Sequence, residues 1–548
     1  MSRKSKFIAG GLLVYAILSV LIVFTSSGAG EVFKPTVSGP SFLEEHGLPA
    51  LARMDSENTA KRIEPLQVMK KIGLLNLTDY DLSYPAQNYE LLSARFEGMG
   101  EAKAEEVDFE GSLTSELNAA LKANAGKRIL VHSAVLTADE TILVPDDTQL
   151  VGRGTRLTGE LDRAFALKQA RNVVISGFTM DGGFGYGVYC VDGEGIVISD
   201  CEFTGLSHKP VVFMGDGRMI VVRNNRMRGN MEGGLYFNGD AQYVLIEDND
   251  MSDNYGTSNW MAGIVLTAID VQDVEDVYAA FREDLHFPAE QRLDSMLKAP
   301  HDVILRNNEV GRNNSSGIYC DGPYKVFLVE NRIAYNDKEG ICLDYGTVGA
   351  YVADNDIIGN GNRGRQTDED LAMDFVLAQG RMSDGSSLSK LPGISIDNAA
   401  YNIVYSNRIS MNYGSGVKMV RTGVRNIVST NLISDNNRSP SDTFSFFGVE
   451  LGAAEADAPA ENLDFEPDYE NIICRNMITG HHYAGIYMAK GSFINDLFDN
   501  SIFDVTTWSI ESETDEFNSC LNNVSNVQSR GIPLSLSIAV PVAGMVNK

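Results

Sequence analysis

A short internal repeat constrains the fold of this chain more than any other feature. Runs of β-branched residues end repeatedly in asparagine, as in Met219-Ile-Val-Val-Arg-Asn-Asn and Val303-Ile-Leu-Arg-Asn-Asn. The last position of this pattern is occupied in turn by Gly177, Cys201, Asn225, Asn249, Asn308, Asn331, Asn355, Asn407, Asn431, Asn476 and Asn500. Successive members lie 23 or 24 residues apart, except for three intervals of 59, 52 and 45 residues. A unit this short cannot bury a core alone, so neighbouring units must stack into a solenoid.

Each unit also contains a second strand that opens with glycine and alternates thereafter. Examples are Gly317-Ile-Tyr-Cys-Asp, Gly340-Ile-Cys-Leu-Asp and Gly393-Ile-Ser-Ile-Asp. Short strands on a fixed period, punctuated by Gly and Asn, indicate coils of parallel strands. An inward asparagine amide can then hydrogen-bond to its copy on the next coil. We therefore interpret the asparagine series as structural.

Residues 111–530 resemble, in these repeats, the right-handed parallel β-helix proteins of the pectate-lyase-like superfamily. This group includes polysaccharide lyases, polygalacturonase-type hydrolases and C5-epimerases. The resemblance implies an all-β fold, a single-stranded right-handed parallel β-helix of 23–24-residue coils with an N-terminal capping helix. The amphipathic stretch Leu113–Leu121 is the candidate for that helix.

The three long intervals predict insertions at residues 267–301, 361–391 and 439–467. The first two carry apolar residues at helical spacing, and the third is acidic and typical of a loop. Loops that break a repeat often line its binding face. Residues 31–110 are expected to form a stalk or accessory region, in which Leu66, Met69, Ile72 and Leu75 have the spacing of a short helix. Residues 531–548 are expected to be a C-terminal capping tail.

The N-terminus predicts export. Basic residues precede an apolar run from Phe7 to Phe24, so residues 1–30 are interpreted as a signal peptide or an uncleaved membrane anchor. The remainder is then secreted or held at the periplasmic face of the inner membrane, and we expect a monomer. The net charge of −29 argues against a nucleic-acid partner. Six cysteines are too few for a disulfide scaffold, and Cys190, Cys320 and Cys474 are expected to point into the core.

Three acidic residues follow equivalent strands of consecutive coils. Because side chains alternate across a strand, Asp321, Asp344 and Asp397 are expected to point outward if their apolar neighbours point inward. Adjacent strands lie about 4.8 Å apart, so Asp321 and Asp397 would be about 10 Å apart at the backbone. Stacked carboxylates repel, which predicts a raised pKa or a shared cation. Such carboxylates suit glycosidic bond cleavage, although Asp is also a common turn residue.

Other outward residues complete the predicted site. Lys418 and Arg421 are expected beside the acids, either holding a substrate anion or pairing with Asp397 and Glu450. Aromatic residues in the outward positions suggest stacking on sugar rings. They also stabilise strands through contacts with neighbouring coils, without any ligand. The predicted substrate-binding residues are Tyr236, Tyr319, Tyr345, Glu450 and Tyr487.

Comparison within the superfamily leaves the reaction open. The acids followed by basic residues resemble polygalacturonase-type hydrolases, although Asn-Thr-Asp, Asp-Asp and Gly-His-Gly motifs are missing. The resemblance to pectate lyases instead implies Ca²⁺ at Asp321, Asp344 and Asp397, with Lys418 or Arg421 as the base. Mannuronan C5-epimerases share the coil pattern, but their Asp-Pro-His-Glu motif is missing. The sequence thus predicts an exported enzyme cleaving an acidic or decorated polysaccharide. A uronan C5-epimerase and a non-catalytic polysaccharide-binding or cell-surface protein are the alternatives.

Overall fold

The computed structural model describes residues 83–102, 105–256, 258–268, 299–344, 346–362, 391–420, 423–437, 446–452, 468, 470–489, 492, 495–513, 518–531 and 538–539. The apolar run Phe7–Phe24 and the apolar patterns of the first two insertions lie outside these residues. Within the described part, no helix is long and apolar enough to cross a membrane.

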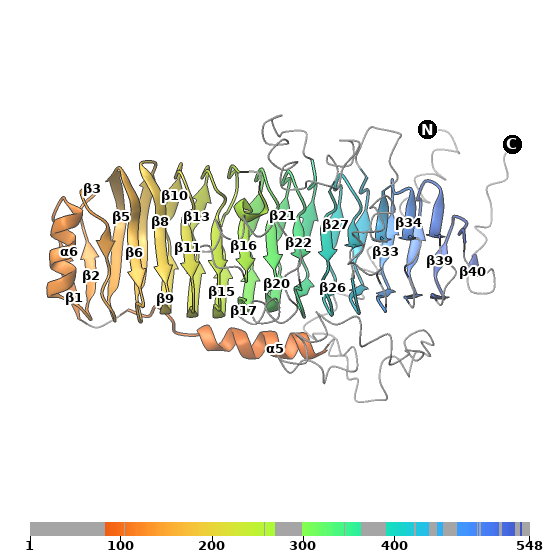
Figure 1. Ribbon diagram of the computed structural model, residues 1–548, viewed down its shortest axis with the longest axis horizontal. Coiled ribbons are helices and arrows are strands. Elements are labelled where there is room, and N and C mark those ends of the chain that lie inside the picture. The colour runs from red at the N-terminus through yellow and green to blue at the C-terminus, as the bar shows by residue number, and fades with distance from the viewer. Residues whose placement is uncertain are drawn as a thin grey trace, which may run out of the picture.

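The described chain winds into an elongated solenoid of parallel strands (Figure 1). Its walls are one 18-stranded, one 13-stranded and one 9-stranded sheet, and all of the strand pairs in them are parallel. The side chains that point inward from the three walls form one continuous apolar core along the solenoid. This architecture confirms the parallel β-helix predicted from the repeat.

The strands of each sheet follow one another along the solenoid. The 13-stranded sheet comprises β4 (Ile142–Leu143), β6 (Leu161–Lys168), β8 (Phe184–Val191), β11 (Val211–Met214), β14 (Leu235–Asn238), β16 (Ile264–Thr267), β19 (Ile318–Asp321), β22 (Ile341–Asp344), β25 (Ile394–Asp397), β28 (Val417–Val420), β31 (Phe447–Leu451), β34 (Ala484–Met488) and β37 (Trp508–Ser512). The 18-stranded sheet comprises β1 (Glu106–Phe109), β2 (Arg128–Val131), β3 (Val135–Ala138), β5 (Gln149–Gly159), β7 (Val174–Asp181), β9 (Glu194–Ser199), β10 (Glu202–Thr204), β12 (Arg218–Arg223), β13 (Arg226–Arg228), β15 (Gln242–Glu247), β17 (His301–Arg306), β20 (Tyr324–Val329), β23 (Tyr351–Ala353), β26 (Ile403–Tyr405), β29 (Ile427–Ser429), β32 (Ile472–Cys474), β35 (Asp496–Phe498) and β38 (Ser519–Leu521). The 9-stranded sheet comprises β18 (Glu309–Gly311), β21 (Arg332–Ala334), β24 (Asp356–Ile358), β27 (Arg408–Ser410), β30 (Leu432–Ser434), β33 (Met477–Thr479), β36 (Ser501–Phe503), β39 (Val524–Ser525) and β40 (Ile538–Ala539).

Helices cover one end and one side of the solenoid. The predicted capping helix is α6 (Thr114–Ala123), which buries Leu117 and Leu121 at the N-terminal end (Figure 1). Two further elements, α5 (Ser83–Ser93) and the 3₁₀ turn η3 (Ala94–Phe96), lie against the outside of the 18-stranded sheet. Strand β1 pairs with β2, so part of the expected stalk region belongs to the solenoid itself.

A ladder of asparagines joins successive coils. The backbone N–H and Nδ2 of Asn225 both donate to Oδ1 of Asn249 at 3.0 Å, and Nδ2 also donates to the carbonyl of Ile198. The same arrangement repeats through Asn308, Asn331, Asn355, Asn407, Asn431, Asn476, Asn500 and Asn523. The predicted structural role of this series is therefore confirmed.

Two more ladders occupy other turns, and the sequence analysis did not identify them. One runs through Asn230, Asn254, Asn313, Asn336, Asn360, Asn412 and Asn436. It ends at His482, whose Nε2 faces the Asn436 amide; burial lowers the pKa of this imidazole to about 4, so it is neutral. The other runs through Asn402, Asn426, Asn471, Asn495 and Asn518.

One expected core residue points the other way. Cys190 and Cys320 lie in the core, as predicted. Cys474 does not, because its strand neighbour Ile473 occupies the core and side chains alternate. The run Ile472-Ile473-Cys474 is apolar throughout, so its pattern alone does not reveal which residue faces inward.

Removing one asparagine from a ladder should destabilise the solenoid strongly. In Asn355→Ala, the backbone N–H and Nδ2 of Asn331 lose their shared acceptor, and the Leu328 carbonyl loses a donor. We expect a loss of about 2–5 kcal/mol in the free energy of unfolding, since buried unpaired groups cost about 1–3 kcal/mol each. Urea unfolding followed by circular dichroism measures this loss. The exposed Lys168→Ala serves as the control, and an equal, small effect of both changes would contradict the structural role.

Candidate functional site

Two columns of side chains run along the outside of the 13-stranded sheet. The first, here called the tyrosine column, is set by the strand register. It contains Ala166, Tyr189, Val212, Tyr236, Val265, Tyr319, Cys342, Ser395, Lys418, Glu450, Tyr487 and Glu511. The second, the acid column, lies two residues further along each strand. It contains Val191, Met214, Asn238, Thr267, Asp321 and Asp344 in register, and Asp397 ends the next strand.

The structure places the three predicted aspartates on neighbouring coils, at the ends of β19, β22 and β25. Asp321 is the register partner of Asp344, so their backbones are one strand spacing apart, about 4.8 Å. All three are buried although they face outward, with 5%, 5% and 8% of their surface exposed. The Tyr319 hydroxyl donates to Oδ2 of Asp344 at 3.2 Å.

Asp321 differs from an ordinary surface carboxyl. Burial raises its pKa from 3.8 to about 7. A raised value was predicted for this group of acids, but from repulsion between the stacked carboxylates. The cause here is desolvation, because a charge is poorly solvated in a buried position. At neutral pH a large fraction of Asp321 therefore carries a proton.

Of the two predicted basic residues, Lys418 lies in the described part of the chain. Lys418 belongs to the tyrosine column beside Ser395, and its Nζ lies 2.9 Å from Oε1 of Glu450. The other oxygen of Glu450 accepts a 2.6 Å hydrogen bond from the Ser415 hydroxyl. Of the two roles foreseen for Lys418, an ion pair with Glu450 is therefore present. Arg421 and Tyr345 lie outside the described residues.

A fourth acid, Asp468, was missed by the sequence analysis. It is completely buried, and its Oδ1 accepts a 2.6 Å hydrogen bond from the Gly423 backbone. Burial raises the pKa of this carboxyl well above its usual range; Asp397 and Glu450 raise it further, whereas Lys418 lowers it. Asp468 thus joins the electrostatic environment of the acid column. It directly follows an insertion, and no strand pattern marks it in the sequence.

The predicted aromatic residues are less open than expected. Tyr236 and Tyr319 retain only 4% and 3% of their exposure. Lys209 Nζ lies 5.0 Å from the centre of the Tyr236 ring, and Trp260 packs edge-on against Tyr319 at 5.9 Å. Tyr487 is half-buried and stacks on Phe447 at 4.2 Å. Tyr236 and Tyr319 therefore offer little open ring surface for stacking on a sugar.

Lys209 links two turns beside the 13-stranded sheet. Its Nζ donates to the carbonyls of Glu232 and Trp260 at 2.6 Å each. Burial lowers the pKa of this lysine to about 8, although Glu232 acts in the opposite direction. The lysine thus joins two turns that lie next to the tyrosine column.

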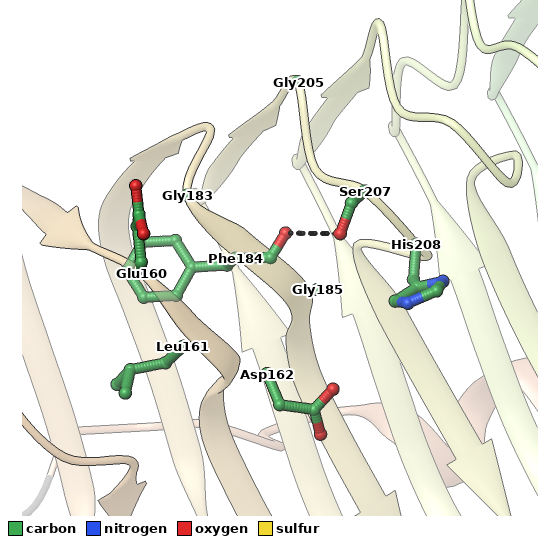
Figure 2. A pocket seen from close by; sticks show the side chains of 9 residues that line it. All are labelled: Glu160, Leu161, Asp162, Gly183, Phe184, Gly185, Gly205, Ser207 and His208. Carbon is green, nitrogen blue, oxygen red and sulfur yellow. Dashed lines mark hydrogen bonds between the residues drawn. The ribbon is translucent and has the colours of Figure 1, made fainter.

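More accessible aromatic residues occur towards the N-terminal end. The Tyr186 ring lies 4.9 Å from His208 in a stacked arrangement and 5.2 Å from Tyr189. The Arg163 guanidinium lies 4.1 Å from the centre of the Tyr189 ring. A shallow depression adjoins them (Figure 2). Its lining residues are Glu160, Leu161, Asp162, Gly183, Phe184, Gly185, Gly205, Ser207 and His208.

The described residues give no support for the expected calcium site. Among the residues described, no three His, Cys, Asp or Glu side chains come together to hold a metal ion. The aspartates are instead buried in positions where desolvation favours the protonated form of Asp321. We therefore assign no metal to the acid column.

Comparisons with known proteins agree with the fold. Residues 163–275 match a family model described as a right-handed β-helix region, and residues 289–375 match the periplasmic copper-binding protein family NosD. No curated protein matches the chain in sequence. The family match and the solenoid together confirm a right-handed parallel β-helix protein, similar to those of the pectate-lyase-like group.

Several solved structures are similar to this chain at low identity. The A-module of Azotobacter vinelandii mannuronan C-5 epimerase AlgE6 is 14% identical, covering 80% of this chain and 99% of the module, with a TM-score of 0.45. The surface adhesin PfbA of Streptococcus pneumoniae is 11% identical, with coverages of 77% and 92% and a TM-score of 0.43. The Dettilon tailspike protein gp208 is 10% identical, with coverages of 72% and 66% and a TM-score of 0.44.

The buried Asp321 should make the stability of the protein depend on pH. Its pKa is higher in the folded than in the unfolded chain, so raising the pH from about 4 to about 7 removes protons from the unfolded state first and lowers stability. We expect Asp321→Asn to match the wild type near pH 4 and to exceed it by about 3–4 kcal/mol at pH 8. Unfolding curves at both pH values measure this difference. The exposed Asp216→Asn is the control, and an equal effect of Asp321→Asn at both pH values would contradict the assignment.

Proposed function

We propose that this protein is an exported enzyme that cleaves glycosidic bonds of an acidic or decorated polysaccharide on the outside of the 13-stranded sheet. The observation that carries the proposal is the pair Asp321 and Asp344. Burial raises the pKa of one carboxyl, Asp321, to about 7, and its register partner lies on the next coil. Two carboxyls in different environments are what glycosidases use as acid and nucleophile or base.

The spacing of the pair suggests the stereochemistry. Carboxyls about 5–5.5 Å apart suit a retaining glycosidase, whereas about 6.5–9.5 Å suits an inverting one. Neighbouring coils place the Asp321 and Asp344 backbones at about the shorter spacing. We therefore assign Asp321 and Asp344, rather than Asp321 and Asp397, as the reacting pair, and we expect retention of the anomeric configuration.

The proposed reaction has two steps. Asp321 donates its proton to the glycosidic oxygen of the leaving sugar, while a carboxylate oxygen of Asp344 bonds to the anomeric carbon. Water then attacks that carbon, Asp321 takes up a proton from the water, and the bond to Asp344 breaks. The Tyr319 hydroxyl holds Oδ2 of Asp344, which orients the carboxylate during attack.

The remaining predicted residues take supporting roles in this proposal. Asp397 lies one coil beyond Asp344, and in this proposal it binds a sugar hydroxyl. Lys418, paired with Glu450, supplies a cation for substrate carboxylates, and Tyr487 offers a half-buried ring on the same face. Tyr345 and Arg421 keep their predicted substrate-binding and anion-binding roles. Export rests on the N-terminal run Phe7–Phe24 and on the partial match to a family described as periplasmic.

Substitution of the pair tests the proposal. We expect Asp321→Asn and Asp344→Asn each to lower turnover by at least a thousandfold while leaving polysaccharide binding nearly unchanged, because the amide removes the chemistry but keeps the shape. The assay is proton NMR of products from a panel of uronate-containing and neutral polysaccharides. The control is Asp216→Asn, which leaves the face intact.

The NMR products also separate the alternatives. New reducing ends with retained configuration support the proposal, and unsaturated sugars would replace it with a lyase. Altered sugar ratios at constant chain length would indicate a C5-epimerase. Binding without any product would overturn the enzyme proposal in favour of a polysaccharide-binding protein.

The pH dependence of the reaction should follow the proton on Asp321. Because the general acid must be protonated, we expect kcat/KM to fall about tenfold per pH unit above pH 7. A rate measured on an activated aryl glycoside, whose leaving group needs little protonation, should lose this dependence. A flat profile between pH 6 and 9 on the natural linkage would remove Asp321 from the acid role.

A further inference from the structure

The shallow depression towards the N-terminal end of the solenoid lies beside an aromatic platform (Figure 2). The half-buried Tyr186 of β8 stacks on the His208 ring at 4.9 Å, with an angle of 18° between the two planes. Tyr189 meets Tyr186 edge-on at 5.2 Å, and the Arg163 guanidinium lies 4.1 Å from the centre of the Tyr189 ring. The Tyr186 ring is therefore held in one orientation while part of it stays open to solvent.

A glycine keeps the depression open between two polar side chains. Gly185 lies between Asp162 and His208, and a Cβ atom at this position would come within 2.5 Å of the Asp162 carbonyl oxygen and 3.1 Å of the His208 ring. The Ser207 hydroxyl borders the same space and donates to the Phe184 carbonyl at 3.4 Å (Figure 2). Carboxylate, imidazole and hydroxyl groups thus surround a gap next to an aromatic ring.

Hydrogen bonds fix these groups before any ligand binds. The backbone N–H of His208 donates to the Gly185 carbonyl at 3.0 Å, and Oε1 of Glu232 lies 2.9 Å from Nδ1 of the same histidine. The adjacent Lys209 holds the turn of Glu232 through a 2.6 Å hydrogen bond to its carbonyl. A site that is already ordered loses little conformational entropy when a ligand arrives.

Exposed apolar side chains continue from the depression along the edge of the solenoid. Met231 and Tyr255 directly follow Asn230 and Asn254 of the second asparagine ladder, which places them on the two coils after Ser207. They keep 53% and 48% of their exposure. With coils about 4.8 Å apart, this row extends over about 10 Å. A ligand lying along the solenoid axis can therefore contact the depression and the row together.

This combination of groups fits a chain of sugars. A pyranose ring has C–H groups on its faces, which pack on aromatic rings, and hydroxyls at its edge, which pair with carboxylate, hydroxyl and imidazole groups. A folded protein partner would bury about 800 Å² on each side of a stable interface. The exposed apolar side chains here instead form a single row, which suits a narrow, extended ligand.

The charges around the depression select against anionic sugars. Glu160 and Asp162 line it and are both exposed, and Glu232 lies close by. Two cations offset part of this charge: Arg163, whose Nε lies 2.9 Å from Oδ2 of Asp162, and Lys209, which is bound by backbone carbonyls. The rim is therefore negative, and it repels a uronate carboxylate but not a neutral sugar.

We infer that the depression, with the row Ser207, Met231 and Tyr255, is a second carbohydrate site that binds a neutral segment of the polysaccharide. It lies where the strands begin, whereas Asp321 lies where they end, and it is four coils or about 19 Å away along the axis. Only a chain of several sugars reaches both places. The inference rests on the proposed function for the kind of polymer, but binding here does not require cleavage.

Binding without cleavage is the first test. In an Asp321→Asn background, we expect Tyr186→Ala and Tyr255→Ala each to weaken binding of neutral galactomannan, xylan or dextran about tenfold, because a stacking ring is lost. Tyr186→Phe, which keeps the ring, should bind normally. Affinity gel electrophoresis measures the binding, and thermal unfolding shows that each variant is folded.

Tyr405→Ala is the matched control for this test. It removes a half-buried tyrosine that stacks on Tyr351, but on the 18-stranded sheet. Its binding should equal that of the parent protein. Equal binding by Tyr186→Ala and Tyr255→Ala, or no binding of any of the three neutral polymers, would overturn the inference.

Reversing a charge on the rim tests the selectivity. We expect Glu160→Lys to raise the affinity for polygalacturonate about fivefold at low salt, and high salt should abolish the gain by screening. The control is Glu97→Lys, an equally exposed change next to the 18-stranded sheet. The same gain in both variants would show a general charge effect and would remove the selectivity for neutral sugars.

Kinetics separate this inference from the proposed cleavage. In the active enzyme, Tyr186→Ala should raise KM for the polymer about fivefold and leave kcat within about twofold, because only ground-state binding is lost. A small aryl glycoside contacts only the reacting pair, so its kcat/KM should not change. Weaker binding in Tyr186→Ala without any turnover by the wild type would keep the second site and reject the cleavage. Turnover with unchanged KM and unchanged binding would do the reverse.

Discussion

The asparagine ladders are the interaction on which the rest of this structure depends. Each rung uses one side-chain oxygen to accept two N–H groups from the previous coil, and one side-chain nitrogen to satisfy a buried carbonyl. A sharp turn in every coil would otherwise leave backbone groups unpaired inside the protein. Because three such ladders run through successive turns, the coils keep a common register. A column of identical positions on the outer faces is the direct result.

The common register brings residues that are one repeat apart in the sequence next to each other on the outer face. Asp321 and Asp344 are 23 residues apart in the chain, yet they lie one strand spacing apart because the coils are stacked. The same stacking carries a cost, since outward carboxyls become buried and Asp321 holds its proton to about pH 7. A protein that needs only turn-capping aspartates would gain stability by exposing them. The desolvated acid is therefore the observation on which the proposed catalytic face rests.

The outer faces of the 13-stranded and 18-stranded sheets also differ in composition. The 13-stranded sheet presents tyrosines, acids and an ion pair, whereas the 18-stranded sheet presents a continuous apolar stripe beneath α5 and η3. An apolar face suits a permanent covering layer, and a polar, titratable face suits a ligand that binds and leaves. The site proposed above follows this division.

The sequence by itself determined the fold, the coil length, the capping helix and the alignment of the three aspartates, because each follows from a local period of 2 or 23–24 residues. Tertiary structure alone decided the rest. It turned Cys474 outward, buried Tyr236 and Tyr319 beneath Lys209 and Trp260, and brought Asp468 to the acid column. It also showed that burial, and not repulsion between the stacked carboxylates, raises the pKa of Asp321. Spacing along a repeat fixes which residues share a face, but the layers packed on that face fix how much water reaches them.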